Sequence, residues 1–433
     1  MAAFDRNDPA YGMYLGILEA ELIPATGCTE PIAIAYGAAK ARQALGALPE
    51  RCRVECSGNI IKNVKSVVVP NTGNLRGIEA AAAAGLVAGD PDVQLQVISH
   101  VAEKDRAAIR AYRDSRPMEV VPYPGEQVFY IAITVWAGAD SAKVVIEDFH
   151  TNITRIEKNG VCLFALEEDR PDQAEAPREL DYDLLSVERI VAFADGVDLF
   201  DVEVVLDRQI AYNTAISREG LTHDWGARIG QTLLQAQGND VRTRAKAAAA
   251  AGSDARMSGC EMPVVIVSGS GNQGMTASLP VIEYAKELNV SRDKLLRALV
   301  VSNLVTIHQK TSIGRLSAFC GAVSAGCGAA AGIAYLHGDG YEVIAHTIVN
   351  TLAILSGMVC DGAKPSCAGK IAVAVEAGLM GYEMYKHGKN QFYGGDGIVK
   401  KGVDNTIRTV GRMAREGMRD TDREILDIMT ENC

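Results

Sequence analysis

The stretch FYIAITV, residues 129–135, decides the fold class of this 433-residue chain. It is rich in β-branched and aromatic residues, and its alternating pattern is typical of a strand with one face on a core. Similar runs surround it, and turns rich in Gly, Asn and Asp separate them. This arrangement favours an antiparallel sheet. The expected strands are 118–121, 128–136, 143–149 and 161–166.

The pattern changes on both sides of this β region. An acidic, Pro-containing linker at 167–177 leads into a sequence that reads as almost wholly helical from residue 180 to the end. Before the β region, helices are expected at 8–22 and 32–46, and short β-like runs at 53–57 and 65–69. The sequence therefore predicts an α+β protein, with a small mixed α/β lobe containing antiparallel strands and a large, mostly helical C-terminal domain.

Three domains are expected. Residues 1–50 form an N-terminal helical segment that docks on the C-terminal domain, residues 51–170 form the α+β domain, and residues 180–433 form the helical domain.

Composition narrows the functional class. Hydrophobic residues make up 48% of the chain, and its net charge of −11 comes without a dense Lys/Arg run, so nucleic acid is not an expected partner. The polar start lacks a signal-peptide core, and the apolar stretch 344–359 is interrupted by polar residues, so no membrane partner is expected. We expect a cytoplasmic protein whose acidic, Ala-rich helical surfaces permit a homodimer. In a reducing compartment, ten cysteines indicate metal binding or catalysis more than crosslinks.

Three of these cysteines stand in Gly/Ala-rich segments: Cys320 in FCGAVSAGCGAAAG, and Cys360 and Cys367 in MVCDGAKPSCAGK. Two nearby thiolates and one distant thiolate can meet at one point. Three thiolates and an open fourth position are what an iron–sulfur cluster needs to act as a Lewis acid. The competing interpretation is that these cysteines only fill the core, as free cysteines usually do.

A fourth cysteine, Cys28, lies in PATGCTEP on a tight turn ahead of the Ala-rich helix. A helix start lowers the pKa of a thiol, so Cys28 is a candidate base or nucleophile.

The loop SGSGNQG, residues 268–274, follows a β-like run and precedes a helix, where backbone N–H groups can bind an anion such as a carboxylate. A plain glycine turn is the alternative. Lys310 and Arg315 could offset the charge of a cluster and a carboxylate.

Together, TGCTEP, the three cysteines with CDGAKPSC, and SGSGNQG resemble the L-cysteine desulfidases, which are relatives of the iron–sulfur L-serine dehydratases. The resemblance runs through nearly the whole chain and is weakest across the β region. It implies a 4Fe–4S cluster held by Cys320, Cys360 and Cys367, with Cys28 as the base. Serine dehydratases carry Ser-His-Thr at the turn where this chain has Cys28, which favours the desulfidase branch.

The implied reaction is β-elimination of sulfide from a small amino acid, L-cysteine, which leaves pyruvate and ammonia. Thr26, Thr29 and Glu30 would position the base or the substrate ammonium. The carboxylate would be held by Ser268, Gly269, Ser270, Gly271, Asn272 and Gln273. A cluster with an open iron is oxygen-sensitive, so protein purified in air could lack it.

Three alternatives stay open at this stage. The first is an L-serine dehydratase with the same mechanism. The second is a pyridoxal-phosphate lyase with Lys246 as the Schiff-base residue. The third is a redox or iron sensor in which Cys327 completes the cluster. Cys433, the last residue, could also reach back to an open iron.

Overall fold

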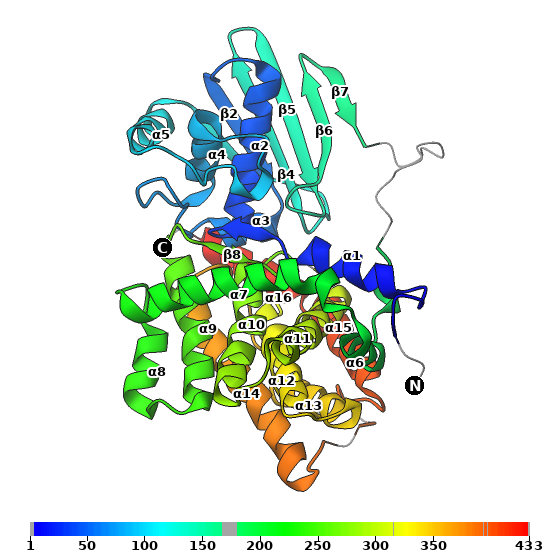
Figure 1. Cartoon of the computed structure of the whole chain (residues 1–433). Helices are drawn as coiled ribbons and strands as arrows, with labels where there is room; N and C mark the ends of the chain where they lie inside the picture. Colours follow the sequence, from blue (N-terminus) through cyan, green and yellow to red (C-terminus); the bar gives the residue numbers. More distant parts are fainter. Residues whose placement is uncertain (1–3, 167–179, 315, 393, 396, 432–433) are drawn as a thin grey trace.

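The computed structural model describes residues 4–166, 180–314, 316–392, 394–395 and 397–431. A sheet lobe, residues 29–165, stands on a larger helical part made of residues 4–23 and 180–431 (Figure 1). The expected combination of a small lobe with antiparallel strands and a large helical part is confirmed.

The sheet has six strands in the order β3-β2-β4-β5-β6-β7. Every neighbouring pair is antiparallel except β2 and β3, which run parallel, so the expectation of a purely antiparallel sheet was wrong at β3. The strand β6 had not been predicted. The bounds are β2 Arg51–Cys56, β3 Met118–Pro122, β4 Tyr130–Ala137, β5 Asp140–Glu147, β6 Ile153–Lys158 and β7 Val161–Ala165.

The β-like run at 65–69 was also wrongly predicted. The helix α3 (Gly58–Val64) occupies the preceding residues, and the apolar run after it contributes only the isolated bridge between Val68 and Arg76. Its valines are buried, so their hydrophobicity reflects burial and not strand pairing.

One face of the sheet is covered by α2 (Thr29–Leu45), which packs on β4 and β5. The helix α4 (Gly77–Ala88) lies against α2, and α5 (Glu103–Ser115) lies against α4. The two inner helices approach closely because their contact residues are small: the Cα of Gly85 lies against the backbone of Ala35.

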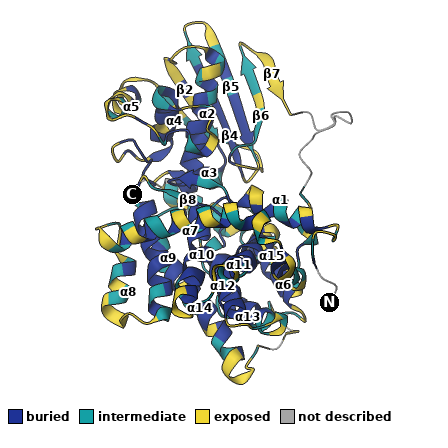
Figure 2. Cartoon of the chain, in the orientation of Figure 1, coloured by how far each residue is buried: buried dark blue, intermediate teal, exposed yellow. Residues whose placement is uncertain are grey.

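The helical part is built around α12, which packs against α10, α11, α13 and α14. Figure 2 shows buried residues concentrated in these inner helices and exposed residues on outer ones such as α8. A π-helical turn, Met413–Gly417, directly follows α15. The bounds are α1 Tyr11–Glu21, α6 Val187–Gly196, α7 Leu199–Thr222, α8 Ile229–Gln237, α9 Val241–Met257, α10 Gly271–Glu287, α11 Arg292–Ile313, α12 Gly321–Leu336, α13 Tyr341–Ile354, α14 Cys367–Gly388, α15 Val403–Arg412 and α16 Arg419–Thr430.

The two parts are joined by a short ribbon in which β1 (Pro24–Thr26) pairs antiparallel with β8 (Pro263–Val265). The helix α1 packs on α7 and α11 of the helical part, whereas α2 packs on the sheet. Residues 1–50 thus contribute to both parts, and the division into three domains stays a prediction. No helix in the described ranges is long and apolar enough to cross a membrane.

Replacing Gly85 with alanine should lower the free energy of unfolding by about 1–3 kcal/mol, because the new Cβ would overlap the Ala35 carbonyl group in a close-packed helix pair. Chemical denaturation measures the loss. Gly369→Ala is the control, since its Cβ would meet nothing within 4 Å in α14. Equal stability of the two variants would contradict the close contact between α2 and α4.

Candidate active site

A cavity of about 100 Å³ lies where the first turn of α2 meets the helical part. Most of the residues singled out from the sequence line it, from both parts of the molecule. They are Cys28, Thr29, Glu30, Ser270, Asn272, Gln273, Lys310, Cys320, Cys360 and Cys367.

Cys320 and Cys360 are placed side by side by an isolated antiparallel bridge between Phe319 and Val359. The N–H of Cys320 donates to the Met358 carbonyl over 3.0 Å, and the N–H of Cys360 donates to the Ala318 carbonyl over 2.6 Å. Backbone hydrogen bonds therefore set the spacing of these two cysteines.

Cys367 is brought to the same place by helix packing. It opens α14, and Cys320 directly precedes α12. The two helices touch through glycine: a Cβ on Gly326 would lie 2.6 Å from the Ala374 backbone, and one on Gly378 would lie 2.6 Å from the Gly326 carbonyl oxygen. Because these contacts fall at similar distances from both helix starts, the helices run in parallel and their N-terminal cysteines meet.

The thiols interact electrostatically. The Cys320 thiol donates to Cys360, and this bond, with help from nearby Lys62 and Lys370, lowers the pKa of Cys360 to about 6. The same bond, together with burial, raises the pKa of Cys320 well above its usual value. The nearby lysines favour the thiolate form of Cys360, which is the form that binds iron.

A 4Fe–4S cluster is compatible with this donor set. In the described part of the chain, no three His, Cys, Asp or Glu side chains are placed to hold one metal ion together. A cluster makes a different demand, because each thiolate binds a separate iron atom. Three cysteines that line one cavity satisfy that demand, and they are the residues that would hold the cluster.

Cys28 lies at the N-cap position of α2, and its Sγ donates to Oε2 of Glu30 over 3.0 Å. The expected lowering of its pKa was wrong. Burial of the thiol and the negative charge of Glu30 raise the pKa of Cys28 well above its usual value, and Arg256 offsets this only in part. Cys28 is therefore a protonated thiol whose proton points at a carboxylate.

Glu30 receives a second hydrogen bond, from Nδ2 of Asn63 over 3.1 Å. The Thr29 hydroxyl lies 3.2 Å from Oε2 of Glu30 and, closer, 2.7 Å from the Gly269 carbonyl oxygen, a bond that ties the Cys28 turn to the 268–274 loop. Thr26 is buried, pairs with the Ser99 hydroxyl at 3.2 Å and does not line the cavity.

The 268–274 loop combines a tight turn with a helix start. Ser268 and Gly269 both have positive φ, of 48° and 79°, and backbone hydrogen bonds between Val267 and Ser270 close the turn. Ser270 then caps α10 by accepting from the Gln273 N–H. Ser270, Asn272 and Gln273 reach the cavity, whereas Ser268, Gly269 and Gly271 shape the loop behind it.

Among the cavity residues that sequence reasoning missed, Arg256 and Asn63 have side chains that form polar contacts with the predicted site residues. Arg256 lies in the last turn of α9, is 3% exposed and donates through Nη1 to Asn272 over 3.2 Å. Its position in an Ala-rich, buried helix was a usable signal, since a charged side chain there needs a partner. Asn63 lies in α3, between the two predicted β-like runs at 53–57 and 65–69, and its placement had no local signal.

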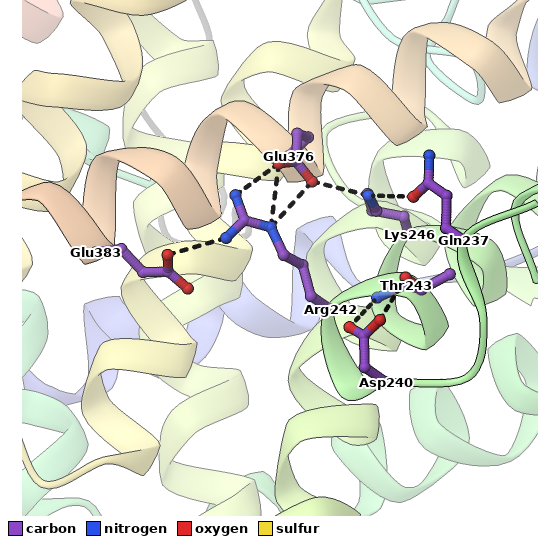
Figure 3. Close-up of polar contacts among 7 residues, drawn as sticks. All are labelled: Gln237, Asp240, Arg242, Thr243, Lys246, Glu376 and Glu383. Atoms are coloured by element: carbon purple, nitrogen blue, oxygen red, sulfur yellow. Dashed lines mark hydrogen bonds and ion pairs between the residues drawn. The ribbon is translucent and has the colours of Figure 1, made fainter.

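Lys246, the Schiff-base candidate of the pyridoxal-phosphate alternative, does not line the cavity. Its Nζ lies 2.9 Å from Oε2 of Glu376 and 2.9 Å from Oε1 of Gln237, and Glu376 also binds Arg242 (Figure 3). This lysine holds helices together and is not available in the cavity.

Cys327, the alternative fourth ligand, is fully buried behind the cavity, and burial raises its pKa to about 12. Cys433 and Arg315 lie outside the described residues.

Comparison with known proteins agrees with this geometry. The serine dehydratase alpha chain family matches residues 92–427, a range that includes Cys320, Cys360 and Cys367. A UPF0597 protein from Desulfitobacterium hafniense is 58% identical over 99% of both chains. UPF0597 proteins from Lachnoclostridium phytofermentans and Finegoldia magna are 52% and 47% identical, over 97% and 96% of this chain and 99% of theirs. The chain therefore belongs to the serine dehydratase alpha chain family.

Proposed function

We propose that the protein is an L-cysteine desulfidase, which converts L-cysteine and water into pyruvate, ammonia and hydrogen sulfide with a 4Fe–4S cluster as cofactor. Membership of the serine dehydratase alpha chain family indicates an amino-acid lyase. One observation carries the finer proposal: the Cys28 thiol shares a single cavity with Cys320, Cys360 and Cys367.

When bound to the three cysteines, the cluster would supply an open iron as a Lewis acid for the β-substituent. The protein must supply the proton transfers. Because the Cys28 thiol donates to Glu30, Glu30 can take its proton and leave a thiolate that accepts the proton from the substrate Cα. The electron pair of the broken C–H bond forms the C=C bond as the C–S bond breaks. Sulfide leaves, and the aminoacrylate product tautomerises and is hydrolysed to pyruvate and ammonia.

L-Serine is the second candidate substrate, and the family description favours it. Loss of water in place of sulfide would use the same proton transfers. The preference for L-cysteine rests on Cys28, which stands at the turn where serine dehydratases carry Ser-His-Thr and lies outside the matched range 92–427. The two substrates must be separated by assay.

The test uses protein purified and reconstituted without oxygen. Sulfide and pyruvate are measured in parallel with L-cysteine and with L-serine as substrate. Release of sulfide and pyruvate in equal amounts from L-cysteine supports the proposal. A kcat/KM that is higher for L-serine than for L-cysteine would show that the protein is instead an L-serine dehydratase. No pyruvate from either substrate, on protein carrying about four iron atoms and four labile sulfides per chain, excludes both.

Replacing Cys360 with alanine should remove cluster binding, so iron and acid-labile sulfide fall from about four each per chain toward zero. Cys327→Ala is the matched control, because Cys327 is a buried cysteine that does not line the cavity, and it should keep its full iron content. Iron loss in Cys327→Ala with retention in Cys360→Ala would reverse the ligand assignment.

Replacing Cys28 with alanine should lower kcat by about 10² to 10⁴, the usual contribution of a positioned base, while iron content stays unchanged. Glu30→Gln should also lower kcat, since the amide cannot take the thiol proton. Cys162→Ala, which removes an exposed cysteine on β7, is the control. Full turnover by Cys28→Ala with its cluster intact would exclude Cys28 as the base.

A further inference from the structure

The most unusual side chain in the cavity wall is Arg256. It is 3% exposed, and its Nε and Nη2 have no hydrogen-bond partner. Its one bond, from Nη1 to Asn272, goes to a neutral amide. It forms no ion pair with any carboxylate among the described residues. A buried guanidinium without a counterion is strongly destabilising, so this arrangement calls for an anion that the folded chain does not itself provide.

The nearest acid in the cavity does not fill this role. Glu30 accepts from Cys28 at 3.0 Å and from Asn63 at 3.1 Å, so its two carboxylate oxygens are already bonded to donors other than Arg256. Arg256 and Glu30 therefore line the same cavity without being bonded to each other; a second cation, Lys310, also lines it.

The cysteine group has cations of its own. Lys62 and Lys370 are the positive charges that stabilise the Cys360 thiolate, whereas Arg256 acts on Cys28. Lys62 pairs with Asp422 at 2.5 Å, and Lys370 pairs with Asp361 at 2.6 Å, so both lysines are fixed beside the thiols. Arg256 is therefore not needed as the counterion of the cysteines.

We propose that Arg256 is the anchor for the α-carboxylate of the substrate, an inference that rests on the proposed amino-acid lyase function. A guanidinium with two vacant N–H positions can bind a carboxylate through two parallel hydrogen bonds. The bond to Asn272 fixes the guanidinium at the start of α10, where Ser270 and the helix N-terminus add further attraction for an anion.

The cavity also offers acceptors to the rest of the substrate. Glu30 is a carboxylate, and Oε1 of Gln273 is buried without a hydrogen-bond donor. Both are acceptors for an α-ammonium group. A cavity that holds these acceptors as well as the Arg256 guanidinium favours a zwitterionic α-amino acid over compounds that lack the free carboxylate.

Gly271 supports the same arrangement. A Cβ at this position would lie 2.5 Å from Nε of Arg256 and 2.6 Å from Cγ2 of Val264. Its φ is not positive, so the backbone alone does not require glycine there. The missing side chain makes room for the guanidinium against the first turn of α10.

The experiment measures binding of L-alanine, which has no β leaving group, by calorimetry on the reconstituted protein. Arg256→Gln should weaken L-alanine binding by about tenfold or more, and Arg256→Lys by less, since it keeps the charge but loses the planar fork. L-Alaninamide should bind the unaltered protein about tenfold or more weakly than L-alanine. Arg408→Gln, which alters an exposed arginine of α15, should bind L-alanine normally.

Two results would overturn the assignment: unchanged L-alanine affinity in a folded Arg256→Gln protein, or equal affinity of the unaltered protein for L-alanine and L-alaninamide. The second comparison needs no variant and so holds even where Arg256→Gln fails to fold. Arg256-dependent binding of L-alanine by protein that releases no pyruvate from L-cysteine or L-serine would support the anchor while removing the proposed elimination. Efficient turnover of L-cysteine by Arg256→Gln with an unchanged KM would support the proposed elimination and overturn the role of Arg256 as the carboxylate anchor.

Discussion

The cavity depends first on how closely α12 and α14 approach each other. Glycines at 326 and 378 let the two backbones touch, and no side chain can be added at either position without moving a helix. Because the helices run in parallel, the close contact between their backbones also keeps Cys320 and Cys367, at their N-terminal ends, close together at the cavity. The bridge between Phe319 and Val359 then adds Cys360 at a fixed spacing. Three cysteines from two distant segments are thus held by backbone contacts, which are stiffer than side-chain packing.

The charges around the cavity are arranged in separate groups. Lys62 and Lys370 stabilise the thiolate form of Cys360, and Glu30 accepts the hydrogen bond from Cys28. Arg256 keeps two N–H groups, Nε and Nη2, without a hydrogen-bond acceptor. Burial strengthens each of these interactions because little water is present to screen them. The same burial keeps Cys28 protonated until a neighbour takes its proton, so the chemistry of this thiol is set by Glu30 more than by the start of α2.

Local sequence pattern predicted much of the architecture. The alternation at 129–135 and the helical periodicity after residue 180 were sufficient for the fold class, because both periods reflect one buried face. Pairing partners were not predictable in the same way. The parallel pairing of β3, the ribbon between β1 and β8, and the strand β6 depend on contacts between distant residues. The valines at 67–69 are buried without being a strand, which a pattern of hydrophobicity alone cannot reveal. Within the site, the cysteines and the glycine loop carried local signals, and so did Arg256 as a charged residue in an Ala-rich helix. Asn63 joins the cavity only through contacts between residues far apart in the sequence.

The ion pair between Lys62 and Asp422 spans 360 residues of sequence, and the same Asp422 accepts from the N–H of Ala318 beside the cysteine bridge. The last helix, α16, thereby fastens the sheet lobe to the wall of the cavity. During synthesis, all three cysteines leave the ribosome before α16 does. At that stage the contacts of Asp422 with Lys62 and with the N–H of Ala318 have not yet formed. The wall around the three cysteines is therefore complete only once α16 has folded against α3, after all three cysteine segments have been synthesised.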